Sequence, residues 1–234
     1  MKKQFLVLVL PFLFFACSDD DTVSLAPQLD YNDKFGETKQ GWTAGFADYP
    51  VVMDSDWALK EGIANLPAPL DTLKKGFMIS GNNHSDDLFM YFKKKVSGLK
   101  ANQKYTASFT VEFASNAPST GWSGVGGAPN SVSVGVGATT VEPKDTIDAL
   151  NYHRLNIGKM NQFEDGKDMK IIGDIGNGTD AFGYKLLTKT GDFTGTTDSK
   201  GNLWLIVGTD SGFEATTTLY YTGIAVKLKE VTGN

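Results

Sequence analysis

The sequence predicts an all-β protein, a two-layer antiparallel jelly-roll-like β-sandwich of about nine or ten strands with few or no helices. Residues 105–113 alternate without a break, with Tyr105, Ala107, Phe109, Val111 and Phe113 on one face and polar side chains on the other. Such a period of two is typical of a half-buried strand. Further short strand-like runs are separated by turns rich in Gly and Asn, and no window of 11 or more residues has a clean helical period.

The N-terminal part of the predicted domain is the least regular. Residues 18 to about 30 have no period and indicate a linker, so folded structure is expected from about Asp33. Residues 41–50 predict a short strand that enters a structured loop. Residues 54–75 predict a long connection, because Pro67 and Pro69 are incompatible with a central strand or a helix interior.

The central pair of strands is predicted at residues 88–92 and 105–113. The link between them contains Gly98 and Asn102, which suit a hairpin or a short connection across a sandwich. We expect this pair to form the centre of an antiparallel sheet. Later strands are expected at 132–136, 152–157, 169–174, 184–188, 203–207 and 219–228, and the run 203–207 is apolar on both faces, as in a central strand.

The N-terminus has the features of a targeting segment. Lys2 and Lys3 precede an apolar run over residues 5–16, which is shorter than the ~20 residues that span a bilayer. The run ends at Ala16 and at Cys17, the only cysteine. This arrangement resembles a bacterial lipobox, and the resemblance implies that the signal peptide 1–16 is removed and Cys17 is acylated, with palmitate among the chains. An ordinary secretory peptide is the alternative.

The acidic stretch that follows, residues 18–21, resembles the signal that sends lipoproteins of Bacteroidetes to the outer face of the outer membrane. A solvated acidic tether is the alternative. The expected organisation is therefore a lipidated acidic linker over residues 17–31 and one β-sandwich domain over residues 32–234. The expected location is the outer membrane, with a lipid anchor and exposure at the cell surface.

The charge of the chain argues against one class of partner. The formal net charge is −5, and without the two lysines of the signal segment 20 basic residues face 27 acidic ones, a charge of −7. Because an acidic protein repels phosphate backbones, no nucleic acid is expected as a partner.

Three short patterns resemble galactose-binding-like jelly rolls of the carbohydrate-binding-module kind: Gly41-Trp42 near the first strand, Gly98-Leu99 followed by Tyr105, and the pair Tyr220-Tyr221 before the last strand. This resemblance implies a β-sandwich with a glycan ligand. Residues 45–50, 80–87 and 208–214 resemble a family of uncharacterised bacterial secreted proteins and lipoproteins, which implies no activity.

Residues that could perform catalysis do not form a recognisable motif. His84 and His153 are the only histidines, and the sequence contains no Gly-x-Ser-x-Gly. Hydrolysis of a glycosidic bond requires two carboxylates ~5–9.5 Å apart. Many pairs could be drawn from seven acidic residues, so no pair is specified: Asp48, Asp86, Asp87, Glu112, Asp174, Asp210 and Glu214.

Polar and aromatic residues in three loops suggest a binding site. If the loops 82–87, 115–130 and 209–214 meet at one end of the sandwich, they form a polar pocket with one aromatic wall, which suits a sugar. Its residues are Asn83, His84, Asp86, Asp87, Trp122 and Asp210. Two alternatives stay open: the polar residues cap their own turns, and Trp122 anchors its loop to the sandwich.

Two further expectations concern a bound metal ion and attached glycans. Asp86 and Asp87 could bind a structural calcium ion, and no other cofactor is expected. Thr22, Thr72 and Thr146 each follow an Asp and precede an apolar residue, which resembles the O-glycosylation site used in Bacteroidetes.

The favoured function is a cell-surface lipoprotein with a non-catalytic binding module, and a glycan is the expected ligand. The alternative is a structural or adaptor subunit of an outer-membrane assembly that binds another protein. A hydrolase that uses an acidic pair is the third possibility.

Overall fold

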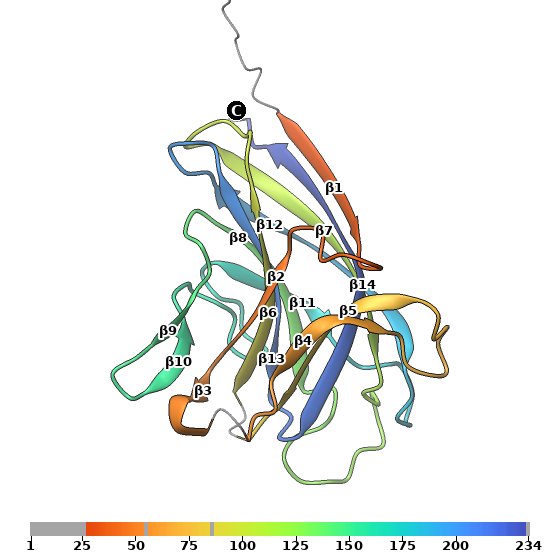
Figure 1. Cartoon of the computed structure of the whole chain (residues 1–234). Coiled ribbons are helices and arrows are strands. Elements are labelled where there is room, and N and C mark those ends of the chain that lie inside the picture. The colour runs from red at the N-terminus through yellow and green to blue at the C-terminus, as the bar shows by residue number, and fades with distance from the viewer. Residues whose placement is uncertain (1–26, 54–55, 85–86, 233–234) are drawn as a thin grey trace, which may run out of the picture.

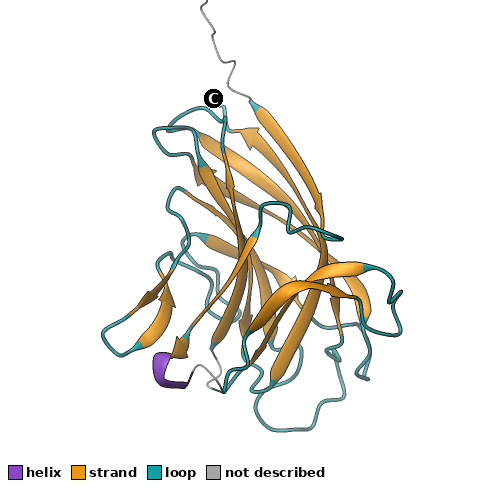
Figure 2. Cartoon of the chain, in the orientation of Figure 1, coloured by secondary structure: helices purple, strands orange, loops and turns teal. Residues whose placement is uncertain are grey.

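A computed structural model describes residues 27–53, 56–84 and 87–232. Within these ranges the regular secondary structure consists of antiparallel strands and one 3-10 turn, η1 (Val51–Met53), joined by loops, as Figures 1 and 2 show. The all-β sandwich that the sequence predicts is confirmed. The structure has more strands than the nine or ten expected: β1 (Gln28–Lys34), β2 (Thr43–Ala47), β3 (Tyr49–Pro50), β4 (Lys60–Asn65), β5 (Lys75–Asn82), β6 (Leu88–Val96), β7 (Lys104–Ser115), β8 (Val132–Thr139), β9 (Asp145–Ile147), β10 (Tyr152–Leu155), β11 (Met169–Asp174), β12 (Lys185–Thr196), β13 (Leu203–Ser211) and β14 (Thr216–Glu230).

Two sheets face each other and have jelly-roll connectivity. The six-stranded sheet has the order β12-β7-β14-β5-β4, with β1 also paired to β14, and the five-stranded sheet has the order β11-β8-β13-β6-β2. From β5 to β8 and from β12 to β14, successive strands alternate between the sheets. This gives β5-β14-β7-β12 opposite β6-β13-β8-β11, the arrangement of a jelly roll.

The core between the sheets follows the alternation in the sequence. Tyr105, Ala107, Phe109, Val111 and Phe113 are all buried, as the strand pattern predicts. The run at 203–207 is a central strand, because β13 pairs with β6 on one side and β8 on the other.

The predicted hairpin is wrong in one respect. β6 and β7 follow each other in the chain, but β6 pairs with β13 and β2, while β7 pairs with β12 and β14. The link between them, which contains Gly98 and Asn102, crosses from one sheet to the other. Both strands have a full apolar inner face, and this pattern does not distinguish a hairpin from two strands that face each other across a core.

Four strands lie where none was expected from the sequence: β1, β4, β5 and β9. β1 begins at Gln28, inside the segment expected to be linker, and pairs with β14 over its whole length. β4 lies within the expected long connection and pairs with β5 at the edge of the six-stranded sheet. Pro67 and Pro69 follow the end of β4, so their restriction on strands holds for their own positions.

A second, smaller core covers the outer face of the five-stranded sheet. The three-stranded sheet β3-β10-β9 and the segment 156–168 lie over this face, and Met160 packs there with Phe89, Ile206 and Met169. Gly135 makes this close approach possible, because a Cβ at this position would collide with the Met160 sulfur. One face of this sheet is therefore occupied by the chain itself.

No helix in the described ranges is long and apolar enough to cross a membrane. The predicted signal peptide, Cys17 and the acidic stretch at 18–21 lie outside these ranges, so they stay predictions.

Candidate functional site

Three loops meet at one end of the sandwich, around the turn from Ser211 to Glu214. On one side, the buried amide of Asn83 donates to the carbonyls of Ser211 and Phe213 at 2.8 and 3.1 Å. Its Oδ1 accepts from the backbone N–H of Asp87 and Leu88, both at 3.4 Å. Asn83 therefore ties the loop after β5 to the turn after β13.

The glycine-rich loop at 119–130 meets the same turn from the other side. The N–H of Glu214 donates to the carbonyl of Gly126 at 2.6 Å. Gly126 and Gly127 have φ of +79° and +78°, and a Cβ on Gly127 would collide with the carbonyl of Gly212. Glycine is required here both for the left-handed backbone and for the close approach.

An aromatic cluster of Trp122, Phe182 and Phe213 is held between these loops. The Trp122 ring meets Phe213 edge to face at 5.7 Å and 88°, and meets Phe182 at 6.3 Å and 81°. Phe213 is buried, whereas 38% of Trp122 and 58% of Phe182 are exposed. The segment of Phe182 is fixed by Asn177, whose buried amide donates to the carbonyls of Ala181 and Gly183, each at 3.0 Å. Two aromatic rings are thus presented to solvent on ordered loops.

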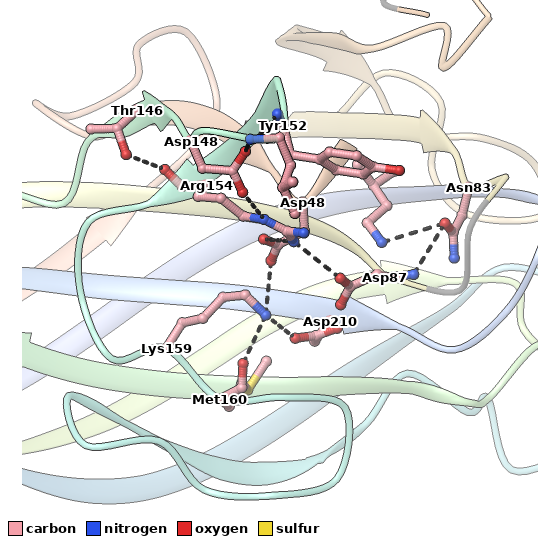
Figure 3. A network of polar contacts seen from close by, with 12 residues as sticks. Asp48, Asn83, Asp87, Thr146, Asp148, Tyr152, Arg154, Lys159, Met160 and Asp210 are labelled. Carbon is pink, nitrogen blue, oxygen red and sulfur yellow. Dashed lines mark hydrogen bonds and ion pairs between the residues drawn. The ribbon is translucent and has the colours of Figure 1, made fainter. Parts of the chain in front are cut away.

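An ionic cluster lies on the covered face of the five-stranded sheet (Figure 3). Lys159 reaches Asp210 at 2.6 Å and Asp48 at 2.9 Å, and also donates to the Met160 carbonyl at 2.9 Å. Arg154 reaches Asp48 at 2.8 Å and Asp87 at 3.3 Å through Nη1. Its Nε lies 3.2 Å from Asp148, whose Oδ1 caps the turn before β10.

Burial shifts the acid–base equilibria of this cluster. Asp210 is 0% exposed, and this burial raises its pKa to about 6, although the neighbouring Lys159 ammonium acts in the opposite direction. Burial and the Asp48 carboxylate also raise the pKa of Asp87. Burial would lower the pKa of Lys159, but the carboxylates of Asp210 and Asp48 raise it overall. Four carboxylates face two cations here, so the cluster has an excess of negative charge at neutral pH.

The ionic cluster fastens the cover to the sheet. Asp210 is on β13 and Asp48 follows β2, whereas Arg154 and Lys159 belong to the covering segments. Of the seven acidic residues considered as a hydrolytic pair, Asp48, Asp87 and Asp210 gather here, each paired with Arg154 or Lys159.

The structure separates the predicted site residues into different environments. Asn83 is buried in the turn, and Asp87 and Asp210 face the cover. His84 packs edge to face on Trp57, and Trp122 contacts Phe213. Asp86 lies outside the described ranges. The three loops meet as expected, but these side chains do not line one shared pocket, and their role in binding stays a prediction.

The calcium ion and the O-glycosylation expected from the sequence stay predictions too. In the part of the chain that the structure describes, no group of three or more His, Cys, Asp or Glu side chains is arranged around a metal position. Thr72 and Thr146 are exposed, although the Thr146 hydroxyl donates to the Arg154 carbonyl at 3.0 Å. Thr22 lies outside the described ranges.

The sequence analysis did not identify three residues of these clusters: Phe182, Arg154 and Lys159. Phe182 stands in a loop without period, and Lys159 lies beside Met160 in a segment that has no strand or helix pattern. A basic residue flanked by apolar side chains was the one available sign that Lys159 is buried.

A cleft of about 510 Å³ lies elsewhere, between the ends of β8 and β12 and the segment 156–158. Two of its polar side chains bond to the chain itself. The Asn156 amide donates to the Glu142 carbonyl at 3.0 Å, and the Thr140 hydroxyl donates to the Thr196 carbonyl at 2.7 Å.

Comparison with solved structures finds matches of low sequence identity and low TM-score. A carbohydrate-binding module of the β-sandwich superfamily is similar at 11% identity and a TM-score of 0.35, with 83% of this chain and 58% of that chain covered. Xylanase 10B modules from Clostridium thermocellum, solved with xylohexaose, match at 10% identity and a TM-score of 0.38, over 87% of this chain and 29% of that chain. A protein from Bacteroides thetaiotaomicron described as sugar-binding matches at 10% identity and 0.37, over 83% and 89%.

The chain thus spans 58% and 29% of the first two of these structures, and at such identities and TM-scores the likeness carries no argument about ligand or activity. No protein-family model matches the sequence, and no curated protein matches it.

Proposed function

We propose that this protein is a non-catalytic binding module that holds a glycan at the loop end of the sandwich, over the aromatic cluster. The observation that supports it is the pair of exposed rings, Trp122 and Phe182, fixed nearly at right angles on converging loops. A sugar ring has an apolar face that stacks on an aromatic side chain, while its hydroxyls bond to polar groups at the rim. Asp180 is exposed beside Gly121 and could accept such bonds.

The position of this end suits a lipid-anchored protein. Gln28, at the start of the first strand, is opposite Lys229, whereas β14 begins at Thr216, beside the loop end. Thirteen strand residues at ~3.3 Å each separate these two points by about 40 Å. Figure 1 shows the start of β1 and the end of β14 together at the opposite end from this loop region. A lipid on Cys17 would therefore leave the aromatic cluster on the side away from the membrane.

A glycan array with the full chain in detergent tests the proposal. We expect binding to at least one class of glycan, and a loss of roughly tenfold or more in affinity for Trp122→Ala, because a stacked ring contributes on the order of 1 kcal/mol beyond its buried area. Trp204→Ala is the matched control. Trp204 is a half-buried Trp at the start of β13, at the other end of the strand that leads to the site. Glycan binding that survives Trp122→Ala and Phe182→Ala unchanged would contradict the proposed site.

A protein partner is the second candidate, and one groove favours it. The groove has a volume of about 430 Å³ and is lined by Phe35, Leu66, Leu73 and Leu186, among others. Leu73 and Leu186 are exposed, which is the feature expected of a surface that docks a protein. If Leu186→Asp removes a co-purifying outer-membrane protein while glycan binding is absent, the adaptor function replaces the first proposal.

The anchor is tested separately. Cys17→Ser should abolish incorporation of labelled fatty acid and release the protein from the membrane fraction. Replacing Asp19, Asp20 and Asp21 by Ala should keep the lipid but protect the protein from external protease, if these residues direct it to the cell surface. Labelling that persists in Cys17→Ser would contradict the lipoprotein proposal.

A further inference from the structure

A small pocket opens beside the aromatic cluster and enters the sandwich between its two sheets. Its volume is about 40 Å³, and its lining includes Ala117, Ile175, Phe182, Phe213 and Thr217. A single water needs ~10–15 Å³ of such space, so the pocket has room for a group of a few heavy atoms but not for a sugar ring. Phe182 lines this pocket and is also one of the two exposed rings.

The pocket contains a buried hydroxyl without a partner. Thr217 is 6% exposed, and its Oγ1 has no hydrogen-bond partner among the residues that the structure describes. Both neighbours in the strand are satisfied: Thr216 donates to Asn82 at 3.2 Å, and Thr218 shares a hydrogen bond with Ser80 at 2.6 Å. An unpaired buried hydroxyl is destabilising, so an acceptor supplied by a ligand would be favourable here.

The rest of the lining defines the chemistry of that ligand group. Ala117, Ile175 and Phe213 provide a buried apolar wall, which suits a methyl group. None of the residues that line the pocket is charged, so a carboxylate, phosphate or ammonium would be buried without a counter-charge. The pocket therefore suits a small neutral group that combines a methyl with a hydrogen-bond acceptor.

We infer that this pocket is a subsite for the acetamido group of an N-acetylated sugar whose ring lies on the exposed aromatic rings. The acetamido carbonyl accepts a hydrogen bond from Thr217 Oγ1, and the methyl packs on Ala117 and Ile175. This inference rests on the proposed glycan function and adds a specificity to it. A plain hydroxyl would leave most of the pocket empty, so sugars without the N-acetyl group bind more weakly.

The test compares two ligands that differ in this group alone. The chitotetraose used is the tetra-N-acetylated form, which has the same β-1,4 linkages and the same length as cellotetraose. Titration calorimetry of the full chain with each ligand measures the preference. We expect chitotetraose to bind at least tenfold more tightly. Thr217→Val keeps the shape of the side chain and removes the hydroxyl, so it should reduce this preference fivefold or more, whereas Thr217→Ser keeps the hydroxyl and should retain it.

Thermal unfolding of the same variants excludes a folding artefact. Thr217→Val should be as stable as the parent protein or more so, because it removes an unpaired polar group. Equal binding of both tetrasaccharides, tighter binding of cellotetraose, or a preference that Thr217→Val leaves unchanged would overturn the acetamido subsite while the glycan module stands. If neither tetrasaccharide binds and the glycan array shows other ligands without N-acetyl groups, the subsite is also overturned. An array without any bound glycan would instead reject the proposed function.

Discussion

The ionic cluster and the aromatic cluster lie within a few residues of each other at the end of β13, yet they use their side chains in opposite ways. In the ionic cluster, Lys159 and Arg154 face the carboxylates of Asp48, Asp87 and Asp210. In the aromatic cluster, only Phe213 is buried, and the other two rings face solvent. This difference indicates that charge in this region fixes the cover to the sheet, whereas the proposed glycan site rests on exposed aromatic surface.

The largest expected effect comes from removing the central cation. Lys159→Met leaves Asp48 and Asp210 without their shared ammonium in a buried site. Breaking a buried ion pair in this way costs ~3–5 kcal/mol of unfolding free energy. Denaturant unfolding at pH 8 measures the loss. Lys167→Met is the matched control, since Lys167 is exposed in the same covering segment and should change stability by less than ~0.5 kcal/mol.

If the ionic cluster serves mainly to hold the cover, amide hydrogen exchange in residues 142–168 should be faster in Lys159→Met than in the parent protein. The glycan affinity of Lys159→Met, measured under conditions where the protein is folded, should stay within about twofold of the parent. A loss of binding as large as that of Trp122→Ala, with little loss of stability, would show that the ionic cluster contacts the ligand.

The pH dependence of stability is the second test. The pKa of Asp210 is raised from 3.8 to about 6, so the native state binds this proton more tightly than the unfolded chain does. The stabilisation that this proton gives is fully present below about pH 4 and is lost as the pH rises through about 6. At 1.36 kcal/mol for each pKa unit, the loss is roughly 3 kcal/mol, and the raised pKa of Asp87 adds to it with the same sign.

Unfolding free energies measured between pH 4.5 and pH 8 check this slope. In Asp210→Asn the group no longer titrates, so most of the decrease with rising pH should disappear. A slope that is unchanged in this variant would mean that Asp210 is already ionised at pH 5, with Lys159 compensating its burial.

Periodic burial of side chains decides how much of the fold the sequence could predict. The alternation at 105–113 and the apolar run at 203–207 predicted β7 and β13, because burial of one or both faces of a strand leaves a periodic pattern. β1, β4 and β9 were missed, since edge strands with one half-exposed face lose this contrast; β1 has polar residues at Gln28, Asp30 and Asn32. β5 was missed although it lies between β14 and β4, because Gly76 and Gly81 interrupt its apolar run.

The candidate site was predictable only in part, for a different reason. Loop positions follow from topology, so the meeting of the three loops could be expected once a sandwich was predicted. Which side chain faces which partner could not, because residues 156–168 of the cover have no periodic signal and the strand expected at 152–157 does not reveal which carboxylates Arg154 meets. The cations that pair with Asp87 and Asp210 come from this cover. Because the sequence does not reveal these cations, Asp87 and Asp210 were interpreted as residues free to bind a ligand.

The third prediction concerns stability at the aromatic cluster. Trp122→Ala should cost only about 1–2 kcal/mol of unfolding free energy, since the side chain is partly exposed, against ~3–5 for a fully buried Trp. Trp42 is buried between the sheets, and its indole N–H donates to Asp33 at 2.8 Å, so Trp42→Ala supplies the buried reference. Equal losses at the two positions, measured by denaturant unfolding, would mean that Trp122 serves mainly as an anchor for its loop.

The smallest effect is expected at His84, and it decides whether the polar loop after β5 belongs to the binding site. His84 is exposed, its Nε2 lies 2.7 Å from the Asn82 amide nitrogen and 3.0 Å from the Asp56 carbonyl, and its ring meets Trp57 edge to face at 5.6 Å. These contacts are surface contacts within one loop region, so His84→Ala should change stability by less than ~1 kcal/mol.

The glycan affinity of His84→Ala should change by less than about twofold, because the contacts of its ring are to Trp57 and not to the aromatic cluster. Titration calorimetry of this variant beside Trp122→Ala compares the two directly. If both variants lose affinity to the same degree, then the polar loop and the aromatic rings form one site, as the sequence first indicated, and the ligand must extend across the turn from Ser211 to Glu214 to reach both.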